Sequence, residues 1–198
     1  AVPMATRAVT ALLEEASLDP KSIALICSVT VTGIAVPSLE ARLMNTVGLG
    51  RKTRRLPIMG LGCLAGVAGI NRVCEYLVGH PDHVAILVSA ELCSLTYQQQ
   101  DLSIPNIIAS GLFGDGCAAV LLAGAEHPLA QQSPLQWLGC QSAFFHNTER
   151  TMGWDVVDSG FKVVLGADVP DIVERELPGE VAELLAQFGL KRSDLDFV

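Results

Sequence analysis

Cys63 is the side chain in this sequence that is best placed for covalent chemistry. It lies in the segment 56–69, where a short apolar run meets a glycine-rich turn and a helical pattern continues to about Gly79. A cysteine in the first turn of a helix faces unpaired backbone N–H groups and the positive end of the helix dipole. Both stabilise a thiolate relative to a thiol. The pattern therefore predicts a nucleophilic cysteine at the start of a helix.

The glycines around this cysteine allow a second interpretation. Gly60, Gly62 and Gly66 stand between an expected strand and an expected helix, as in a dinucleotide-binding turn, and Glu91 ends the next expected strand, near the place of a ribose-binding acid. The turn does not open the chain, and a cysteine has no use beside a pyrophosphate. A third possibility is that Cys63 is a small buried hydrophobe. Spacing alone leaves the three interpretations open.

The elements that position these residues are predicted from periodicity and from turn residues. Apolar runs at 23–31, 84–91 and 117–123 are typical of strands, the first two covered on both faces. The predicted helices cover 4–16, 39–47 with Ser38 as the N-cap, the segment after Cys63, and 107–113. Beyond these we expect an edge strand at 135–145, a loop or lid at 147–160, a strand at 163–165, a helix at 169–188 broken near residues 178–179, and a strand beginning at 193–198.

Composition narrows the class of protein. The chain has 198 residues, half of them hydrophobic, and a net charge of −8, which argues against a nucleic-acid-binding surface. No apolar run reaches the roughly 18 residues that span a bilayer, and no export signal is visible, so we expect no membrane partner, a cytoplasmic location and reduced cysteines. The four histidines lack ligand spacing, so no metal site is expected. The basic cluster 51–55 is interpreted as a solvated loop, with a phosphate or coenzyme contact as the alternative.

Three segments in order resemble one family. Residues 59–69, with Cys63, look like the active-site segment of type III polyketide synthases, the chalcone-synthase-like branch of the thiolase superfamily, and residues 88–96 and 110–119 resemble the two segments that follow. The resemblance implies an α/β protein with a thiolase-like layered α/β/α fold, its mixed sheet covered by helices. Residues 1–134 would be an N-terminal half, incomplete at its start, that carries the nucleophile, and residues 135–198 the truncated beginning of a second half.

The same resemblance implies a reaction and a set of site residues. Cys63 would carry an acyl group as a thioester during decarboxylative condensation of malonyl-CoA onto an acyl-CoA starter, with coenzyme A thioesters as substrates, no bound cofactor, and a homodimer as the assembly. Phe113 matches the gatekeeper, although its type alone suits core packing as well. The remaining matches line the cavity, and the first two of them lie in a loop that reaches the subunit interface: Thr32, Val36, Glu91, Cys93, Thr96, Trp154 and Val163.

The sequence also departs from the family. It has about half the family's length, and the expected catalytic histidine and asparagine match nothing in it, so we expect a fragment that is inactive alone. Val36 and Cys93 replace a methionine and a threonine of the plant enzymes, a bacterial pattern. The small Val36 favours a long tunnel, hence a long-chain acyl starter and alkylpyrone or alkylresorcinol products. The alternatives are a tetrahydroxynaphthalene-type synthase that uses malonyl-CoA only, a dinucleotide-binding oxidoreductase, and a non-catalytic dimerisation module.

Overall fold

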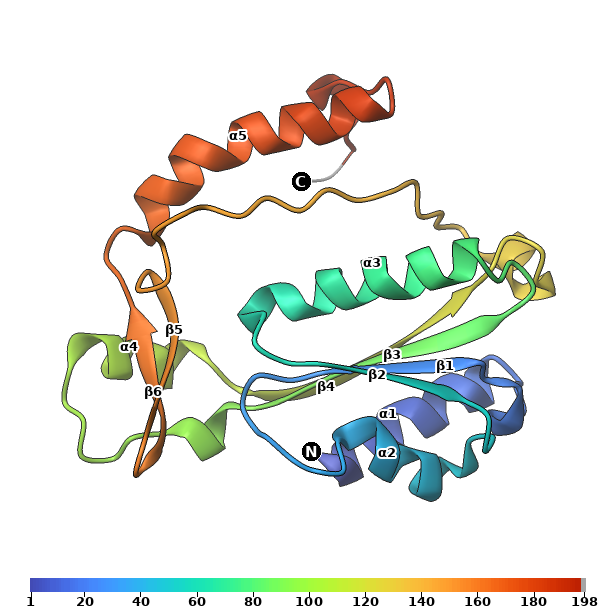
Figure 1. Ribbon diagram of the computed structural model, residues 1–198, viewed down its shortest axis with the longest axis horizontal. Helices are drawn as coiled ribbons and strands as arrows, with labels where there is room; N and C mark the ends of the chain where they lie inside the picture. Colours follow the sequence, from blue (N-terminus) through green and yellow to red (C-terminus); the bar gives the residue numbers. More distant parts are fainter. Residues whose placement is uncertain (197–198) are drawn as a thin grey trace. The chain divides into compact units, whose positions relative to one another are not determined.

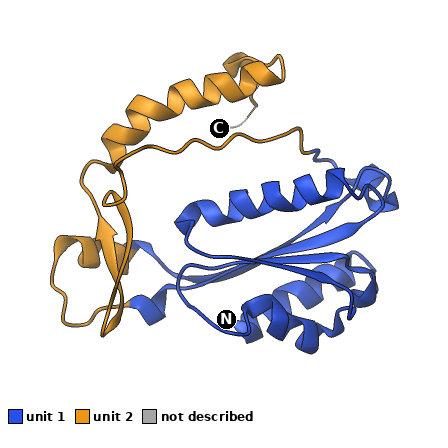
Figure 2. Ribbon diagram, viewed as in Figure 1, with its two compact units in different colours: residues 1–96, 112–136 blue, residues 97–111, 137–198 orange. Residues whose placement is uncertain are grey.

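The computed structural model describes residues 1–196. Contacts divide the chain into two compact units, residues 1–96 with 112–136 and residues 97–111 with 137–198 (Figure 2). The division near residue 136 lies close to the predicted boundary at 134–135, but the stretch 97–111 groups with the later residues. That the two units are the two halves of a thiolase-like protein stays a prediction.

A four-stranded mixed sheet forms the centre of the first unit (Figure 1). The strand order is β2-β1-β3-β4, in which β1 is parallel to both of its neighbours and β4 is antiparallel to β3. The three apolar runs were correctly predicted as strands, and the parallel strand–helix–strand unit is confirmed. The bounds are β1 Leu25–Val29, β2 Arg54–Ile58, β3 Val84–Leu92 and β4 Asp115–Ala123.

Helices cover both faces of this sheet (Figure 1). On one face lie α1 (Val2–Glu15) and α2 (Leu39–Leu43), the latter continued by a π-helical turn at Met44–Gly48, and on the other lies α3 (Ala65–Val78). Because side chains alternate along a strand, β1 sends Cys27 into the core under α3 and Ile26 into the core under α1 and α2. The predicted covering of β1 on both faces is therefore confirmed.

Gly69 allows α3 to approach the sheet closely. A Cβ at this position would lie 2.7 Å from Cδ1 of Leu87 and 3.1 Å from Cγ1 of Val29. Only a residue without a side chain fits without displacing buried atoms. The glycine therefore sets the depth at which α3, and the turn that precedes it, sit on the sheet.

The second unit contains α4 (Ile104–Leu112), of which it holds all but the last residue, a hairpin and a long helix, α5 (Val169–Gln187). The hairpin pairs β5 (Met152–Val157) with β6 (Gly160–Leu165) in antiparallel register. Gln98 holds its turn, because the Gln98 amide donates to the carbonyls of Ser159 (3.3 Å) and Phe161 (3.1 Å). Side-chain contacts thus join two segments of this unit that lie far apart in sequence.

Several expectations were wrong. Residues 135–145 form no strand among the described residues, because no neighbouring backbone pairs with them. The segment 147–160 is not a loop throughout, since it contains β5, and its turn signal was Asp158-Ser159-Gly160, where Gly160 has φ +114°. Helix α5 is not broken, because Pro178 lies on its exposed side, where water can satisfy the carbonyl one turn earlier.

Three local expectations also need correction. Arg54 and Arg55 belong to β2 rather than to a solvated loop: Arg54 donates to the Tyr76 hydroxyl at 2.7 Å. Ser38 occupies the N-cap position of α2 but makes no capping hydrogen bond. The strand predicted to begin at 193 is instead a 3₁₀ turn at Arg192–Asp194, and the predicted continuation at Phe197 and Val198 lies outside the described residues.

Candidate active site

The candidate site lies along one edge of the sheet in the first unit. Val29 pairs with Ile58 on one side and with Ser89 on the other, so the carboxyl ends of three parallel strands meet at this edge. The loops that follow β1, β2 and β3 carry Thr32, Cys63 and Cys93 in turn. Such an edge is where open α/β sheets collect functional side chains.

Cys63 stands in a tight turn between β2 and α3. Gly60 and Gly62 have φ of +90° and +56°, a region that other residues resist, and a 3₁₀ turn at Gly62–Leu64 leads directly into α3. The sequence placed the cysteine in the first turn of the helix; it lies in the 3₁₀ turn just before it. Its side chain is exposed, so the interpretation as a buried hydrophobe is wrong.

Glu91 closes this edge through an unusually complete set of hydrogen bonds. Its carboxylate accepts from the backbone N–H of Val31 (2.9 Å) and of Thr32 (3.1 Å), and from the Thr32 hydroxyl (2.6 Å). The Thr32 hydroxyl oxygen in turn accepts from the backbone N–H of Leu92 at 2.8 Å. The end of β3 and the start of the loop after β1 are therefore locked together.

These contacts weigh against the dinucleotide-binding alternative. A ribose-binding acid needs a free carboxylate, whereas that of Glu91 is occupied by neighbouring donors. The chain also differs from a dinucleotide-binding unit in strand order. The strand before the glycine turn, β2, is the outermost strand of the sheet, and the next strand in sequence, β3, is separated from it by β1. In a dinucleotide-binding unit the corresponding strand is internal.

Cys93 follows β3 directly and interacts electrostatically with the thiol of Cys63. Burial raises the pKa of Cys93, and the negative charges of Glu91, Asp115 and Cys63 raise it further, in that order. The backbone N–H and the hydroxyl of Ser94 donate to the Asp115 carboxylate at 2.8 and 2.7 Å, which fixes the 3₁₀ turn at Cys93–Thr96 against β4. Cys93 is thus a neutral, well-positioned side chain near Cys63.

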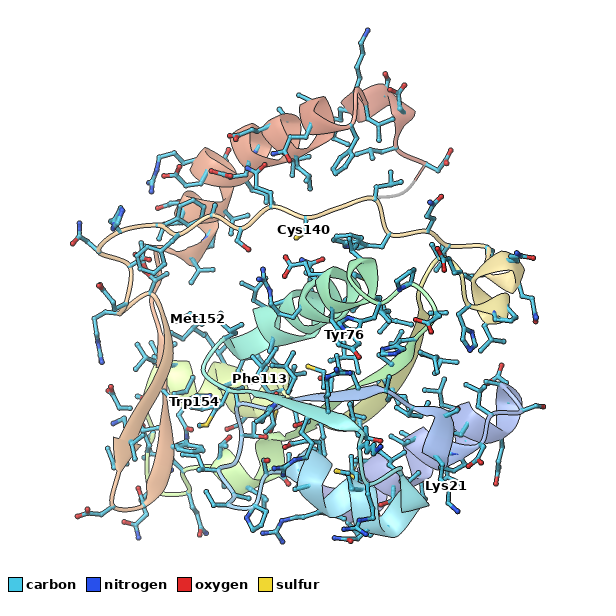
Figure 3. All side chains as sticks on the ribbon, turned by 45° about the vertical axis from the view of Figure 1, so that its right-hand side comes forward. Lys21, Tyr76, Phe113, Cys140, Met152 and Trp154 are labelled. Carbon is cyan, nitrogen blue, oxygen red and sulfur yellow. The ribbon has the colours of Figure 1, made fainter. Side chains whose placement is uncertain are left out.

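The other predicted site residues of the first unit differ in how they are held. Thr96 is buried, and its hydroxyl donates to the carbonyl of Cys93 at 2.9 Å. Phe113 is half-buried at the point where the chain leaves α4 and enters β4 (Figure 3). Val36 is 92% exposed in the loop between β1 and α2. The structure therefore collects Thr32, Cys63, Glu91 and Cys93 at one edge and leaves Val36 pointing into the surroundings.

Trp154 and Val163 belong to the second unit. They are direct partners across the β5–β6 hairpin, and the Trp154 ring lies 6.3 Å from that of Phe161. The sequence treated them as separate cavity residues in a loop and a strand. Their cavity-lining role stays a prediction.

Two contributors to this edge were missed from the sequence. Neither Ser94 nor Asp115 was assigned a role, because nothing in their spacing along the sequence shows that they meet. Glu40, near the start of α2, is fully buried although glutamate is seldom found in a core.

Among residues 1–196, no three histidine, cysteine or acidic side chains gather as a metal site. In the same part of the chain, no helix is long and apolar enough to cross a membrane.

Comparison with known proteins identifies the family of this arrangement. A sequence model of the FAE1/type III polyketide synthase-like proteins matches residues 2–135. A 1,3,6,8-tetrahydroxynaphthalene synthase from Streptomyces peucetius subsp. caesius is 40% identical over 195 residues, which are 97% of this chain and 51% of that protein. A putative chalcone synthase from Bacillus subtilis (strain 168) is 42% identical over 171 residues, 84% of this chain and 47% of that protein.

Solved structures agree with the sequence comparison. The 1,3,6,8-tetrahydroxynaphthalene synthase of Streptomyces coelicolor A3(2), a bacterial type III polyketide synthase, aligns with a TM-score of 0.83 at 36% identity, covering 98% of this chain and 55% of that one. The chain thus spans about half the length of the relatives it matches. The predicted thiolase-like layered fold, present in part, is confirmed. With the exposed cysteine between β2 and α3, the family match to most of the first unit shows that the chain belongs to the FAE1/type III polyketide synthase-like family.

Proposed function

We propose that this chain is the nucleophile-bearing part of a type III polyketide synthase, an acyltransferase in which Cys63 carries the growing acyl chain. The observation that supports it most directly is the exposed thiol in the turn before α3, at the sheet edge shared with Glu91 and Cys93. Family membership supports the same assignment. The substrates we assign are coenzyme A thioesters, and the homodimer belongs to the proposal as well.

The chemistry follows from the position of the thiol. The Cys63 thiolate attacks the carbonyl carbon of an acyl-CoA, and coenzyme A leaves as its thiolate, so the acyl group passes to the cysteine. Backbone N–H groups at the start of α3 would help to polarise the thioester oxygen in this proposal. Loss of carbon dioxide from malonyl-CoA gives a carbanion that attacks the Cys63 thioester, forms a carbon–carbon bond and releases the Cys63 thiolate.

None of the three histidines of the first unit, His80, His83 and His127, lies at the edge that carries Cys63. His80 and His83 lie after the far end of α3, where they stack on each other with ring centres 4.9 Å apart, and we assign neither of them a catalytic role. In this proposal, the group that takes the proton and stabilises the carbanion belongs to a part of the synthase that this chain does not include.

Starter choice is the finer part of the proposal. Two similar proteins are 1,3,6,8-tetrahydroxynaphthalene synthases, which favours a reaction of that type over the long-chain acyl starter inferred from Val36. Val36 is 92% exposed, so within its own unit it bounds no tunnel. We therefore place the malonyl-CoA-only synthase first and the acyl-primed synthase second.

Alkylation tests the role of Cys63. The intact gene product is treated with limiting iodoacetamide at neutral pH, and each cysteine is quantified by mass spectrometry. We expect Cys63 to be modified first, with protection by malonyl-CoA and none by NADPH. Protection by NADPH, or a Cys63→Ala variant that still makes polyketide, would refute the assignment.

A substitution at Val36 tests starter choice. Val36→Phe in the intact gene product is assayed with malonyl-CoA alone and with a long-chain acyl-CoA added, and products are identified by mass spectrometry. In a malonyl-only synthase the added acyl-CoA has no effect, so the two mixtures give the same products as each other, both for the native protein and for the variant. Long-chain products from the native enzyme that are lost in the variant would instead support the acyl-primed reaction.

A further inference from the structure

Glu40 is a buried carboxylate that the proposed reaction does not use. It is the second residue of α2 and has no exposed surface. Burying a carboxylate is costly unless hydrogen bonds compensate it, and an apolar side chain of similar size would fill the space without that cost. The presence of a charge here calls for a role that an apolar residue could not perform.

Two hydroxyl groups from different segments meet at this carboxylate. Ser28, on β1, donates to Oε2 at 2.7 Å, and Ser38, at the end of the following loop, donates to Oε1 through a short hydrogen bond. Arg55 on β2 lies farther away, with 3.9 Å between its Nη1 and Oε1. Glu40 thus joins the sheet to the last residue before α2, which explains why the Ser38 hydroxyl does not cap the helix.

The segment between the two anchors is the β1–α2 loop, residues 30–38. Glu91 holds its beginning through the backbone of Val31 and Thr32, and Glu40 holds its end through Ser38. The middle, residues 33–37, is entirely apolar in sequence yet exposed, with Ile34 at 65% and Val36 at 92%. Because both ends of this exposed apolar segment are held, its side chains are presented in a defined position.

We propose that Glu40 is a positioning residue: together with Glu91 it fixes both ends of the β1–α2 loop and so determines where the exposed side chains of Ile34 and Val36 stand. The consequence for product choice rests on the proposed function. The positioning itself does not, because it follows from the contacts of Glu40 and Glu91 alone.

Two serines provide a matched test. Ser38→Ala and Ser28→Ala each remove one hydroxyl donor from the same carboxylate, but only Ser38 belongs to the loop. Thermolysin, which cleaves before large apolar residues, is applied to the intact gene product, and the cut before Ile34 is quantified by mass spectrometry. Cleavage by a protease reports the population of the opened segment when opening is fast.

We expect Ser38→Ala to be cut in the loop about five times faster than the native protein, the effect of losing one net hydrogen bond. Ser28→Ala should stay within about two-fold of the native rate, since it leaves the loop end attached. Urea unfolding of both variants corrects for any general loss of stability. Equal acceleration by the two serine variants, or an unchanged rate for Ser38→Ala, would overturn the proposal.

Conservative replacement of Glu40 provides a second arm. Glu40→Gln keeps two polar atoms that can bond both serine hydroxyls, so its loop should be cut at close to the native rate, whereas Glu40→Met should be cut faster than Ser38→Ala. A fast-cut Glu40→Gln loop together with a slow-cut Glu40→Met loop would contradict the role of the hydrogen bonds.

Activity gives a separate readout. In the intact gene product supplied with malonyl-CoA, Ser38→Ala should change the ratio of products and Ser28→Ala should not. Unchanged ratios in Ser38→Ala despite faster cleavage would remove the link between loop position and product. A native protein that makes no polyketide would refute the proposed function, and the cleavage contrast would still decide the role of Glu40.

Discussion

Replacing the Glu91 carboxylate by an amide should lower the stability of the protein and loosen the start of the β1–α2 loop. In Glu91→Gln the side chain keeps its size, but one of the two acceptor oxygens becomes an N–H₂ group facing other donors. The native carboxylate accepts from the N–H of Val31, the N–H of Thr32 and the hydroxyl of Thr32 at 2.6 to 3.1 Å. With the amide oxygen in the Oε2 position, the N–H₂ group would face the N–H of Val31, which in the native protein bonds both carboxylate oxygens (2.9 and 3.1 Å), so at least one hydrogen bond would be lost.

The expected size of the effect follows from the type of bond. A hydrogen bond to a charged group contributes about 1.5–3 kcal/mol, and a buried donor left unpaired costs about 1–3 kcal/mol. Since Glu91 is half-buried, we expect the free energy of unfolding to fall by about 2–3 kcal/mol. The same substitution at Glu75, an exposed partner of Arg72 on α3, should cost under about 0.5 kcal/mol.

Urea denaturation measures the stability, and amide hydrogen exchange at residues 31 and 32 measures the local lock. Both amides should exchange faster in Glu91→Gln and be unchanged in Glu75→Gln. A Glu91→Gln protein within about 0.5 kcal/mol of the native one, with both amides still protected, would show that the carboxylate is not what holds the loop.

Three further predictions concern the surroundings of the site. In urea denaturation, Gly69→Ala should destabilise by about 1–2 kcal/mol because its Cβ would overlap the sheet, whereas Gly66→Ala, with open space around it, should stabilise by up to about 1 kcal/mol; shifts of equal sign would refute the packing argument. Hydrogen bonds from Ser94 hold the pKa of Asp115 below its usual range, so this stabilisation is complete above the unfolded carboxyl's pKa, about 3.9, and is lost as the pH falls further. In Ser94→Ala the Asp115 carboxyl, followed by NMR, should titrate at higher pH, and an unmoved titration would contradict the assignment. Burial, with a smaller effect of a nearby carboxylate, raises the pKa of Cys27 to about 12, so iodoacetamide at pH 8 should leave Cys27 unmodified until urea unfolds the chain.

The sheet could be predicted from sequence because its signal is local. The residues at 23–31, all apolar or β-branched except Ser28, leave few options besides a strand covered on both faces, and the structure has β1 there with every residue buried. The edge strand predicted at 135–145 was wrong because a strand also needs a pairing partner, which the residues of the segment itself do not identify.

The sequence predicted the candidate nucleophile, but it did not predict the side-chain contacts that hold the surrounding loops. Cys63 was found because glycines and a helix start lie beside it in the chain. Glu91 was correctly placed at a strand end, yet its contacts with Thr32 join residues about sixty positions apart. Glu40 left no sequence signal at all, since a glutamate in the first turn of a helix is ordinary on a surface and only the fold shows that it is buried.

The central position of β1 has a consequence for the order of events during synthesis. β1 and β2 are made first, but a two-stranded pair is marginal in water, and β1 gains its other neighbour only when β3, sixty residues later in register (Leu25 with Ala85), leaves the ribosome. Until then the three strand ends that surround the Cys63 turn are not assembled. The nascent chain therefore carries the Cys63 thiol before the residues around it are in place, and the candidate site forms only with this long-range strand pairing.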